Sequence, residues 1–120
     1  MHTIVAVMIN DELLGTHRQE LRRGTVVLAC LLALRAPEYG YALLKRLDAA
    51  GIPSDANTIY PLLRRLEERG LLTSEWNTDD TRPRKFYRTS PAGSALADQL
   101  MTDMTGLTAS LHALNGGDIA

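Results

Sequence analysis

The distribution of apolar residues along the chain predicts mainly helical structure. Nearly every residue from 25 to 34 is apolar, which predicts a helix buried on all sides that ends before Pro37. A second helix is predicted over about residues 39–49, with leucines on one face and charged residues on the other. A further helix is expected at residues 14–22, whereas residues 3–9 fit a strand, a helix or a disordered leader.

The segment that ends at Gly70 has the clearest amphipathic pattern. Ser54, Asp55 and Asn57 are all competent N-caps, and Pro61 belongs near the start of a helix because it lacks a donor. Successive residues of a helix are 100° apart around its axis, so one third of the circumference of this helix is apolar. This apolar stripe consists of Ile59, Leu62, Leu63 and Leu66. The opposite side is polar and consists of Asn57, Pro61, Arg64 and Glu68, flanked by Tyr60 and Arg65.

Two alternating segments follow, and they predict a β-hairpin. One face of the first segment consists of Leu72, Ser74 and Trp76, and one face of the second consists of Lys85, Tyr87 and Thr89. Residues 77–84 between them are polar and rich in turn formers. We expect Trp76 to cover the core, and the alternative is an aromatic platform for a planar ligand.

The last predicted helix begins at Ser90-Pro91, an N-cap followed by proline at the first helical position. Apolar residues then recur at alternating spacings of three and four, as Ala97, Leu100, Met104, Leu107, Leu111 and Leu114. This heptad pattern predicts packing against a partner helix, but it is too short for a free coiled coil. We therefore expect these six residues to lack partners within one chain and to form a homodimer interface.

Composition is that of one soluble domain. The chain has 120 residues, of which 45% are hydrophobic and 22% charged. The single cysteine, Cys30, cannot form an internal disulfide, and its apolar surroundings predict a core position. No segment resembles a signal peptide or is long enough to span a membrane, so we expect a cytoplasmic protein without a membrane partner.

The net charge of −1 conceals an asymmetry. All 13 Lys and Arg residues lie between Arg18 and Arg88, a segment that also holds nine acidic residues and carries a net +4. The two ends together hold five acidic residues and no basic one. A basic middle between acidic ends suggests one surface that meets an anion.

Three helices followed by a basic-tipped hairpin predict a winged helix-turn-helix with a C-terminal dimerisation helix, a mainly α fold with a small β-hairpin. The major groove of DNA admits one helix, whose polar face meets base edges while its apolar face is held by a core. We expect Asn57, Tyr60 and Arg64 to reach base edges. The full set expected to contact DNA is Asn57, Thr58, Tyr60, Arg64, Arg65, Tyr41, Arg82, Arg84 and Lys85. Tyr41 is suited to phosphates, and the last three are suited to phosphates or the minor groove.

The sequence resembles the PadR family of bacterial transcriptional regulators over roughly residues 20–96. The matching stretches are Leu21–Thr25, Tyr39–Leu47, Thr58–Glu67, Arg69–Leu72 and Arg84–Arg88, with Ser90 and Gly93 after them. The resemblance implies a homodimeric winged helix, usually a repressor, that binds a palindromic operator. The C-terminal part is similar to the small subfamily with one dimerisation helix.

Two departures from the family pattern stand out. The segment before Leu14 has no counterpart in it, and Thr89 stands where the family usually has an aliphatic residue, which is expected to weaken packing. The domain boundaries we draw are an N-terminal extension, the DNA-binding domain, the dimerisation helix and a tail, at residues 1–20, 21–90, 91–114 and 115–120. The extension is a candidate contributor to the dimer.

The same residues also fit functions other than DNA binding. Arg64 and the charged residues of the predicted hairpin, which we call the wing, also fit a solvated surface. Arg64 could then pair with Glu68. A winged helix can also serve as a protein–protein adaptor, or as a sensor with a small-molecule effector pocket at the dimer interface. No nucleophile–base pair, phosphate-binding loop or metal-ligand spacing is present, so we expect no catalysis, no cofactor and no metal.

Overall fold

The computed structural model describes residues 9–79 and 81–116, so most of the undecided segment 3–9 lies outside it. The described residues form five helices and three strands, which confirms the mainly helical fold. Their order is α2 (Asp11–Arg23), α3 (Thr25–Ala33), β1 (Glu38–Tyr39), α4 (Gly40–Ala49), α5 (Ala56–Glu68), β2 (Leu72–Asn77), β3 (Arg84–Thr89) and α6 (Pro91–Leu114). Helix α2 crosses the boundary that we drew at residue 20.

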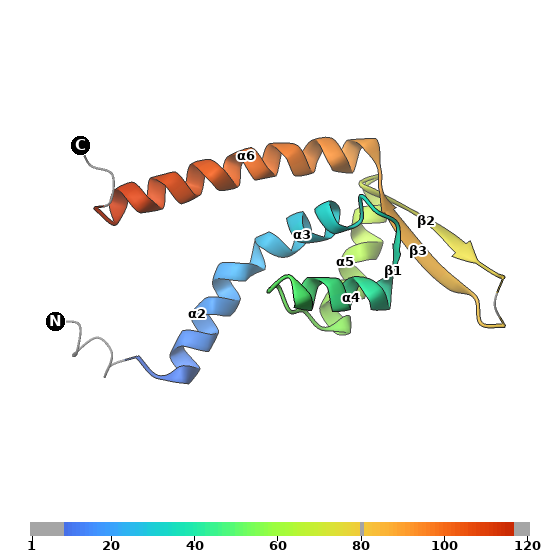
Figure 1. Ribbon diagram of the computed structural model, residues 1–120, viewed down its shortest axis with the longest axis horizontal. Coiled ribbons are helices and arrows are strands. Elements are labelled where there is room, and N and C mark those ends of the chain that lie inside the picture. The colour runs from blue at the N-terminus through green and yellow to red at the C-terminus, as the bar shows by residue number, and fades with distance from the viewer. Residues whose placement is uncertain (1–8, 80, 117–120) are drawn as a thin grey trace.

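The molecule is extended because three parts project from one body (Figure 1). Helices α3, α4 and α5 pack together, the β2–β3 hairpin points away on one side, and α2 and α6 point away on the other. The radius of gyration is 18.1 Å, against about 14 Å for a compact domain of this length. The excess length belongs mainly to helices with little to pack against.

The core of the body is built almost entirely from leucine. Its fully buried side chains come from the central helices and from the start of β2, and they are Cys30, Leu31, Leu34, Leu43, Leu47, Ile59, Leu63, Leu66 and Leu72. Cys30 is fully buried, so it is a core residue as predicted, and this burial raises the pKa of its thiol to about 12. Helix α3 is buried on only part of its surface, because Val26 and Val27 are half-buried.

Helix α5 has the predicted stripe and the predicted end. Asp55 is the N-cap that the structure selects, with its Oδ1 accepting from the Thr58 backbone N–H at 2.8 Å. The four stripe residues are all buried. Gly70 follows the helix with a φ of +75°, a conformation that glycine adopts without strain.

The sheet has one more strand than the hairpin predicted. Strand β3 lies in the middle, pairing antiparallel with β2 on one side and with β1 on the other. Strand β1 has only two residues, Glu38 and Tyr39, opposite Tyr87 and Phe86. A strand this short has no alternation to recognise, and its pairing depends on residues almost fifty positions away.

Two expectations for individual hairpin residues were wrong. Trp76 does not cover the core, because it is 64% exposed near the end of β2, where it borders a surface hollow together with Gly40 and Tyr60. Thr89 does not weaken the packing at the end of β3. Its hydroxyl donates to the Leu31 carbonyl at 2.6 Å and its backbone N–H donates to the Leu34 carbonyl at 2.8 Å. The buried polar atom is therefore satisfied, and it ties the sheet to α3.

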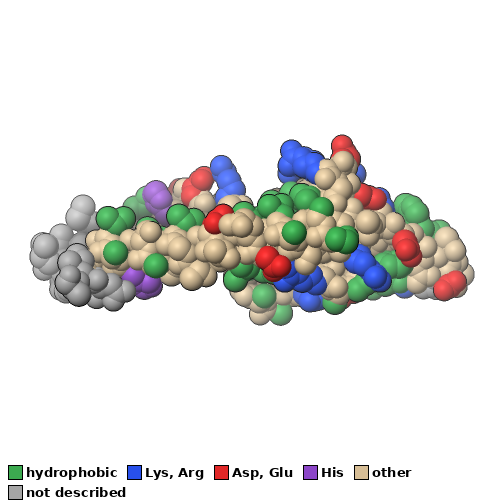
Figure 2. Space-filling model, turned by 90° about the horizontal axis from the view of Figure 1, so that it is seen from above, with side chains coloured by type: hydrophobic (Ala, Val, Ile, Leu, Met, Phe, Trp, Pro, Cys, Tyr) green, Lys and Arg blue, Asp and Glu red, His purple; other side chains and the backbone are tan. Residues whose placement is uncertain are grey.

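The heptad seam of α6 is divided, which corrects the expectation that all six residues lack partners within the chain. Ala97 is buried and Leu100 packs against the core. Arg35, just after the end of α3, forms an ion pair with Asp98 of α6 at 2.7 Å. The outer seam is exposed and consists of Leu107 (61%), Leu111 (60%) and Leu114 (84%). Figure 2 shows hydrophobic side chains spaced along this projecting arm, with Lys and Arg side chains gathered elsewhere.

Candidate nucleic-acid interface

The outward face of α5 presents polar side chains that nothing else in the described structure engages. Asn57 and Arg64 are both exposed. Among the described residues, no hydrogen bond or ion pair reaches the Arg64 guanidinium, and Glu68 does not hold it. Because the stripe beneath is fixed in the core, Arg64 must point away from the body. Its five donors are available to a ligand on this face.

Tyr60 flanks this face on the side nearer the wing. A Cβ at Gly40 would overlap the Tyr60 ring, so glycine at the start of α4 allows the close approach. Tyr60 is nonetheless 36% exposed. Its ring is a packing element, and its edge is part of the outward surface.

Tyr41 and Arg84 form one unit with Tyr39. The Arg84 guanidinium lies 4.8 Å from the Tyr39 ring centre and donates from Nη1 to the Tyr41 hydroxyl at 3.1 Å. The two tyrosine rings stack at 6.0 Å, and Asn77 donates to the Tyr39 hydroxyl at 2.6 Å. Since the Tyr41 oxygen accepts from Arg84, its own hydrogen is directed elsewhere. Tyr41 is 45% exposed, and this hydrogen can be donated to a phosphate.

Lys85 joins the wing to α5 instead of extending from the tip. Its Nζ lies 3.1 Å from the Glu67 carboxylate, which also accepts from the Ser74 hydroxyl. The same ammonium lies 6.0 Å from the Trp76 ring centre and 5.4 Å from that of Tyr87. Glu67 of α5 therefore contacts both strands of the wing and acts as a positioning residue between wing and helix. Sequence reasoning missed it because its partners lie on another element.

We predict an acid transition in Trp76 fluorescence that depends on Glu67. The Ser74 hydrogen bond, and after it Lys85, lower the pKa of Glu67, while burial acts in the opposite direction. Because the folded-state pKa is the lower one, this contact stabilises the fold fully above the unfolded-state value of about 4.3. The contribution is lost as the pH falls through the folded-state pKa. Emission of Trp76, the single tryptophan, should then shift with a midpoint below the ordinary pKa of a glutamate carboxyl.

The variant Glu67→Gln should lack this transition and show the acid-form emission at every pH. Glu68→Gln is the matched control, because Glu68 is exposed on the same helix and forms no hydrogen bond or ion pair with the described residues of the wing. It should keep the transition. The same pH profile in Glu67→Gln and in the unmodified protein would show that Glu67 does not hold Lys85.

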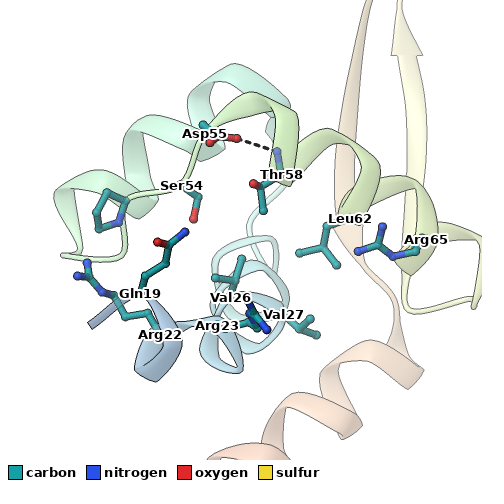
Figure 3. Close-up of a pocket in the computed structure, with 11 residues that line it drawn as sticks. Gln19, Arg22, Arg23, Val26, Val27, Ser54, Asp55, Thr58, Leu62 and Arg65 are labelled. Carbon is teal, nitrogen blue, oxygen red and sulfur yellow. Dashed lines mark hydrogen bonds between the residues drawn. The ribbon is translucent and has the colours of Figure 1, made fainter. Parts of the chain in front are cut away.

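On its other side, α5 borders a groove against α2 and α3, with a volume of about 680 Å³ (Figure 3). Thr58 and Arg65, both expected to contact DNA, line this groove and do not share the face of Arg64. Arg22 and Arg23 of α2 line it too, although they were not among the residues expected to contact DNA. The signals available were their place in the Leu21–Thr25 stretch that resembles the family and at the start of the basic middle of the chain.

The predicted DNA-contacting residues thus fall into three groups. Asn57 and Arg64 point outward from α5, Thr58 and Arg65 face the groove, and the wing and α4 carry the rest. Arg82 is exposed in the turn between β2 and β3. The described residues contain no group of three metal-ligating side chains, and none of their helices is long and apolar enough to cross a membrane.

Comparison with known proteins agrees with this architecture. The model of the Transcriptional regulator PadR-like family matches residues 27–99, more than half of the chain. Transcriptional regulator Rv3488 of Mycobacterium tuberculosis is 44% identical over 57 residues, which are 48% of this chain and 53% of that protein. The match therefore spans about half the length of this relative.

Solved structures extend the similarity to most of the chain. A PadR family transcriptional regulator from Eggerthella lenta is 45% identical with a TM-score of 0.83, covering 87% of this chain and 93% of that one. A PadR-like transcriptional regulator from Bacillus cereus has a TM-score of 0.73 over 82% of this chain and 99% of its own, at 20% identity. The second similarity concerns the fold alone.

Proposed function

Since the chain belongs to the PadR-like family of transcriptional regulators, we propose that it is a repressor that binds a palindromic operator as a homodimer. Helix α5 enters the major groove, and the wing contacts the backbone or the minor groove beside it. Two copies related by a two-fold axis present two such helices to two half-sites. The family is one of regulators and not of enzymes.

The observation that carries this proposal is the division of α5 into a buried stripe and a free polar face. A recognition helix needs its apolar side held rigidly and its polar side unengaged, and α5 has both properties. A protein–protein adaptor would have no use for an exposed Arg64 with unused donors beside an arginine-bearing wing. The adaptor is therefore the weaker alternative.

Dimerisation is supported by the outer seam of α6. Leu107, Leu111 and Leu114 are spaced four and three residues apart and expose apolar surface that water would otherwise cover. Helix α2, which projects on the same side of the molecule as α6, carries two further exposed leucines, Leu13 and Leu21. A second copy that packs its own α6 against these helices would bury both surfaces. A sensor with an effector pocket at this interface is the other alternative, and for this chain we expect effector binding to be weak or absent.

The function is tested by measuring the anisotropy of a labelled duplex of random sequence as the protein is added. Binding with a dissociation constant of about 1–100 µM at physiological salt, weakening as salt rises, is expected of a DNA-binding protein. An adaptor of net charge −1 would show no salt-dependent binding. That outcome would overturn the proposal.

For the wing, we expect Arg82→Ala to weaken binding equally for all duplex sequences. Arg82 is exposed in the turn, where a phosphate contact carries no base information. The slope of log K against log salt should fall by about 0.9, the value for one phosphate. Arg88→Ala, at the inner end of the same hairpin, should leave the slope unchanged. A loss confined to one operator base pair would instead assign base reading to Arg82.

A further inference from the structure

We propose that the groove between α2, α3 and α5 holds the DNA backbone strand on the side of α5 opposite the wing. This inference rests on the proposed function, because it takes α5 to lie in the major groove. It adds Arg22 and Arg23 of α2 to the DNA-binding surface. The N-terminal helix thereby gains a second role besides dimerisation.

The argument begins with the dimensions of the major groove. The groove is about 12 Å wide and a helix with its side chains is about 10–12 Å across. Both backbone strands that border the groove therefore lie next to a helix inserted in it. The wing, with Arg82 and the Tyr41–Arg84 unit, serves the strand on one side. The other strand must meet whatever flanks α5 on the α2 side.

The arrangement around α5 identifies that flank. Arg65 follows Arg64 by 100° and so turns from the outward face toward α2 and α3, on the same side as Thr58. Figure 3 shows Arg65 on the α5 side at one end of the groove, with Arg22 and Arg23 on the facing α2 side and Arg22 the farther of the two from Arg65. Three guanidinium groups thus border the same groove.

The charge of the groove favours binding of an extended anion. Arg22, Arg23 and Arg65 face a single carboxylate among the lining residues, that of Asp55, which already accepts from the Thr58 N–H at 2.8 Å. The net charge of the lining is therefore +2. Thr58 adds a hydroxyl donor, and hydroxyl groups contact phosphates widely in protein–DNA interfaces.

The arginines of α2 are held only loosely by their own helix. Arg22 Nε donates to the Arg18 carbonyl at 3.3 Å, and Arg23 pairs with Glu20 at 3.2 Å. The Arg23–Glu20 pair is exposed, with 76% and 56% of the two side chains accessible, and exposed pairs of this kind contribute little. Each guanidinium has five donors, so a phosphate can be bound without losing a strong contact.

The floor of the groove is apolar, which raises the alternative that the α6 helix of a second copy lies there. Val26, Val27 and Leu62 make up this floor. The exposed arm of α6, residues 99–114, carries one carboxylate, Asp103, and so offers little to three arginines. DNA offers one phosphate per 3.4 Å of each strand. Charge complementarity therefore favours DNA.

The test compares two variants with one control by duplex anisotropy between 50 and 200 mM salt. The double variant Arg22→Gln/Arg23→Gln and the single variant Arg65→Gln remove groove charges but keep good helix formers. We expect the slope of log K against log salt to fall by about 1.8 and about 0.9, one phosphate per arginine. The loss should be equal for an operator and an unrelated duplex. The control is Arg18→Gln, one turn earlier on α2 and outside the groove, which should change neither the salt slope nor the affinity for either duplex.

The outcomes separate this inference from the proposed function. Unchanged slopes in both variants, with normal binding by the unmodified protein, would overturn the groove assignment alone. A shift from dimer to monomer in sedimentation of the double variant would assign the groove to the α6 helix of the second copy and also overturn it. Absence of DNA binding by the unmodified protein would overturn both proposals. Thermal melting confirms that each variant is folded.

Discussion

Replacing Arg64 with alanine is expected to weaken operator binding by about 1–3 kcal/mol and to relax the preference at one base pair per half-site. The reason is geometric, because Arg64 points outward from the buried stripe of α5 and has no partner among the described residues. A guanidinium matches the two acceptors on the guanine edge. Folding should change by less than about 0.5 kcal/mol, since the residue is exposed. Competition titrations with single-base operator variants measure the effect.

Arg64→Lys is the matched control for this prediction. It retains the positive charge but not the planar fork that bonds two acceptors at once. We expect it to keep the salt dependence and to lose the base preference. If Arg64→Ala weakens binding equally at every base pair, Arg64 contacts phosphate and some other residue reads the sequence.

The second large effect is expected from Leu107→Asp, which should convert the dimer to monomers. Leu107 lies at the middle of the seam and is 61% exposed in one chain, so it is free to meet a partner helix. An aspartate there would place an unpaired charge in an apolar interface, which costs several kcal/mol unless the charge is paired. Sedimentation or native mass measurement at micromolar concentration reads the result directly. The monomer should also lose cooperative binding to a palindrome.

Ala109→Asp is the control for the seam. Residue 109 is exposed 200° around the same helix from residue 107, so the added charge stays in water. This variant should remain a dimer. A stable monomer of the unmodified protein would contradict the seam interpretation, as would a dimer in Leu107→Asp with unchanged melting.

Local pattern was sufficient to predict the element that matters most. The stripe of α5, its start among three candidate caps and its end at Gly70 all follow from side-chain periodicity and backbone chemistry, and the structure confirms them. The same holds for Ser90 and Pro91 at the start of α6. These features depend on residues within a few positions of each other, which the sequence displays directly.

Features that depend on distant residues were not predictable in the same way. Strand β1 exists because Tyr39 meets Phe86 across the sheet, and Trp76 lies exposed near the end of β2 instead of over the core. Likewise, Thr89 is tolerated only because the Leu31 carbonyl lies within hydrogen-bond reach. Periodicity shows which residues share a face, but not how far that face is covered.

The division of the seam has the same cause. A heptad pattern shows that Ala97 and Leu107 lie on one side of α6, but not that the body of the protein ends between them. The groups flanking α5 were also hidden. The partners of Glu67 lie on the wing, and the neighbours of Arg65 lie on α2. Both sets come together only when the chain is folded.

The measurement that tests the central claim most directly is selection of bound duplexes from a random library by the unmodified protein. If two copies of α5 enter successive major grooves, the selected sequences should share a palindrome. Its half-sites should be centred one helical turn apart, about 34 Å, or a multiple of that distance. Recovery of unrelated sequences, or of a motif without two-fold symmetry, would contradict the account.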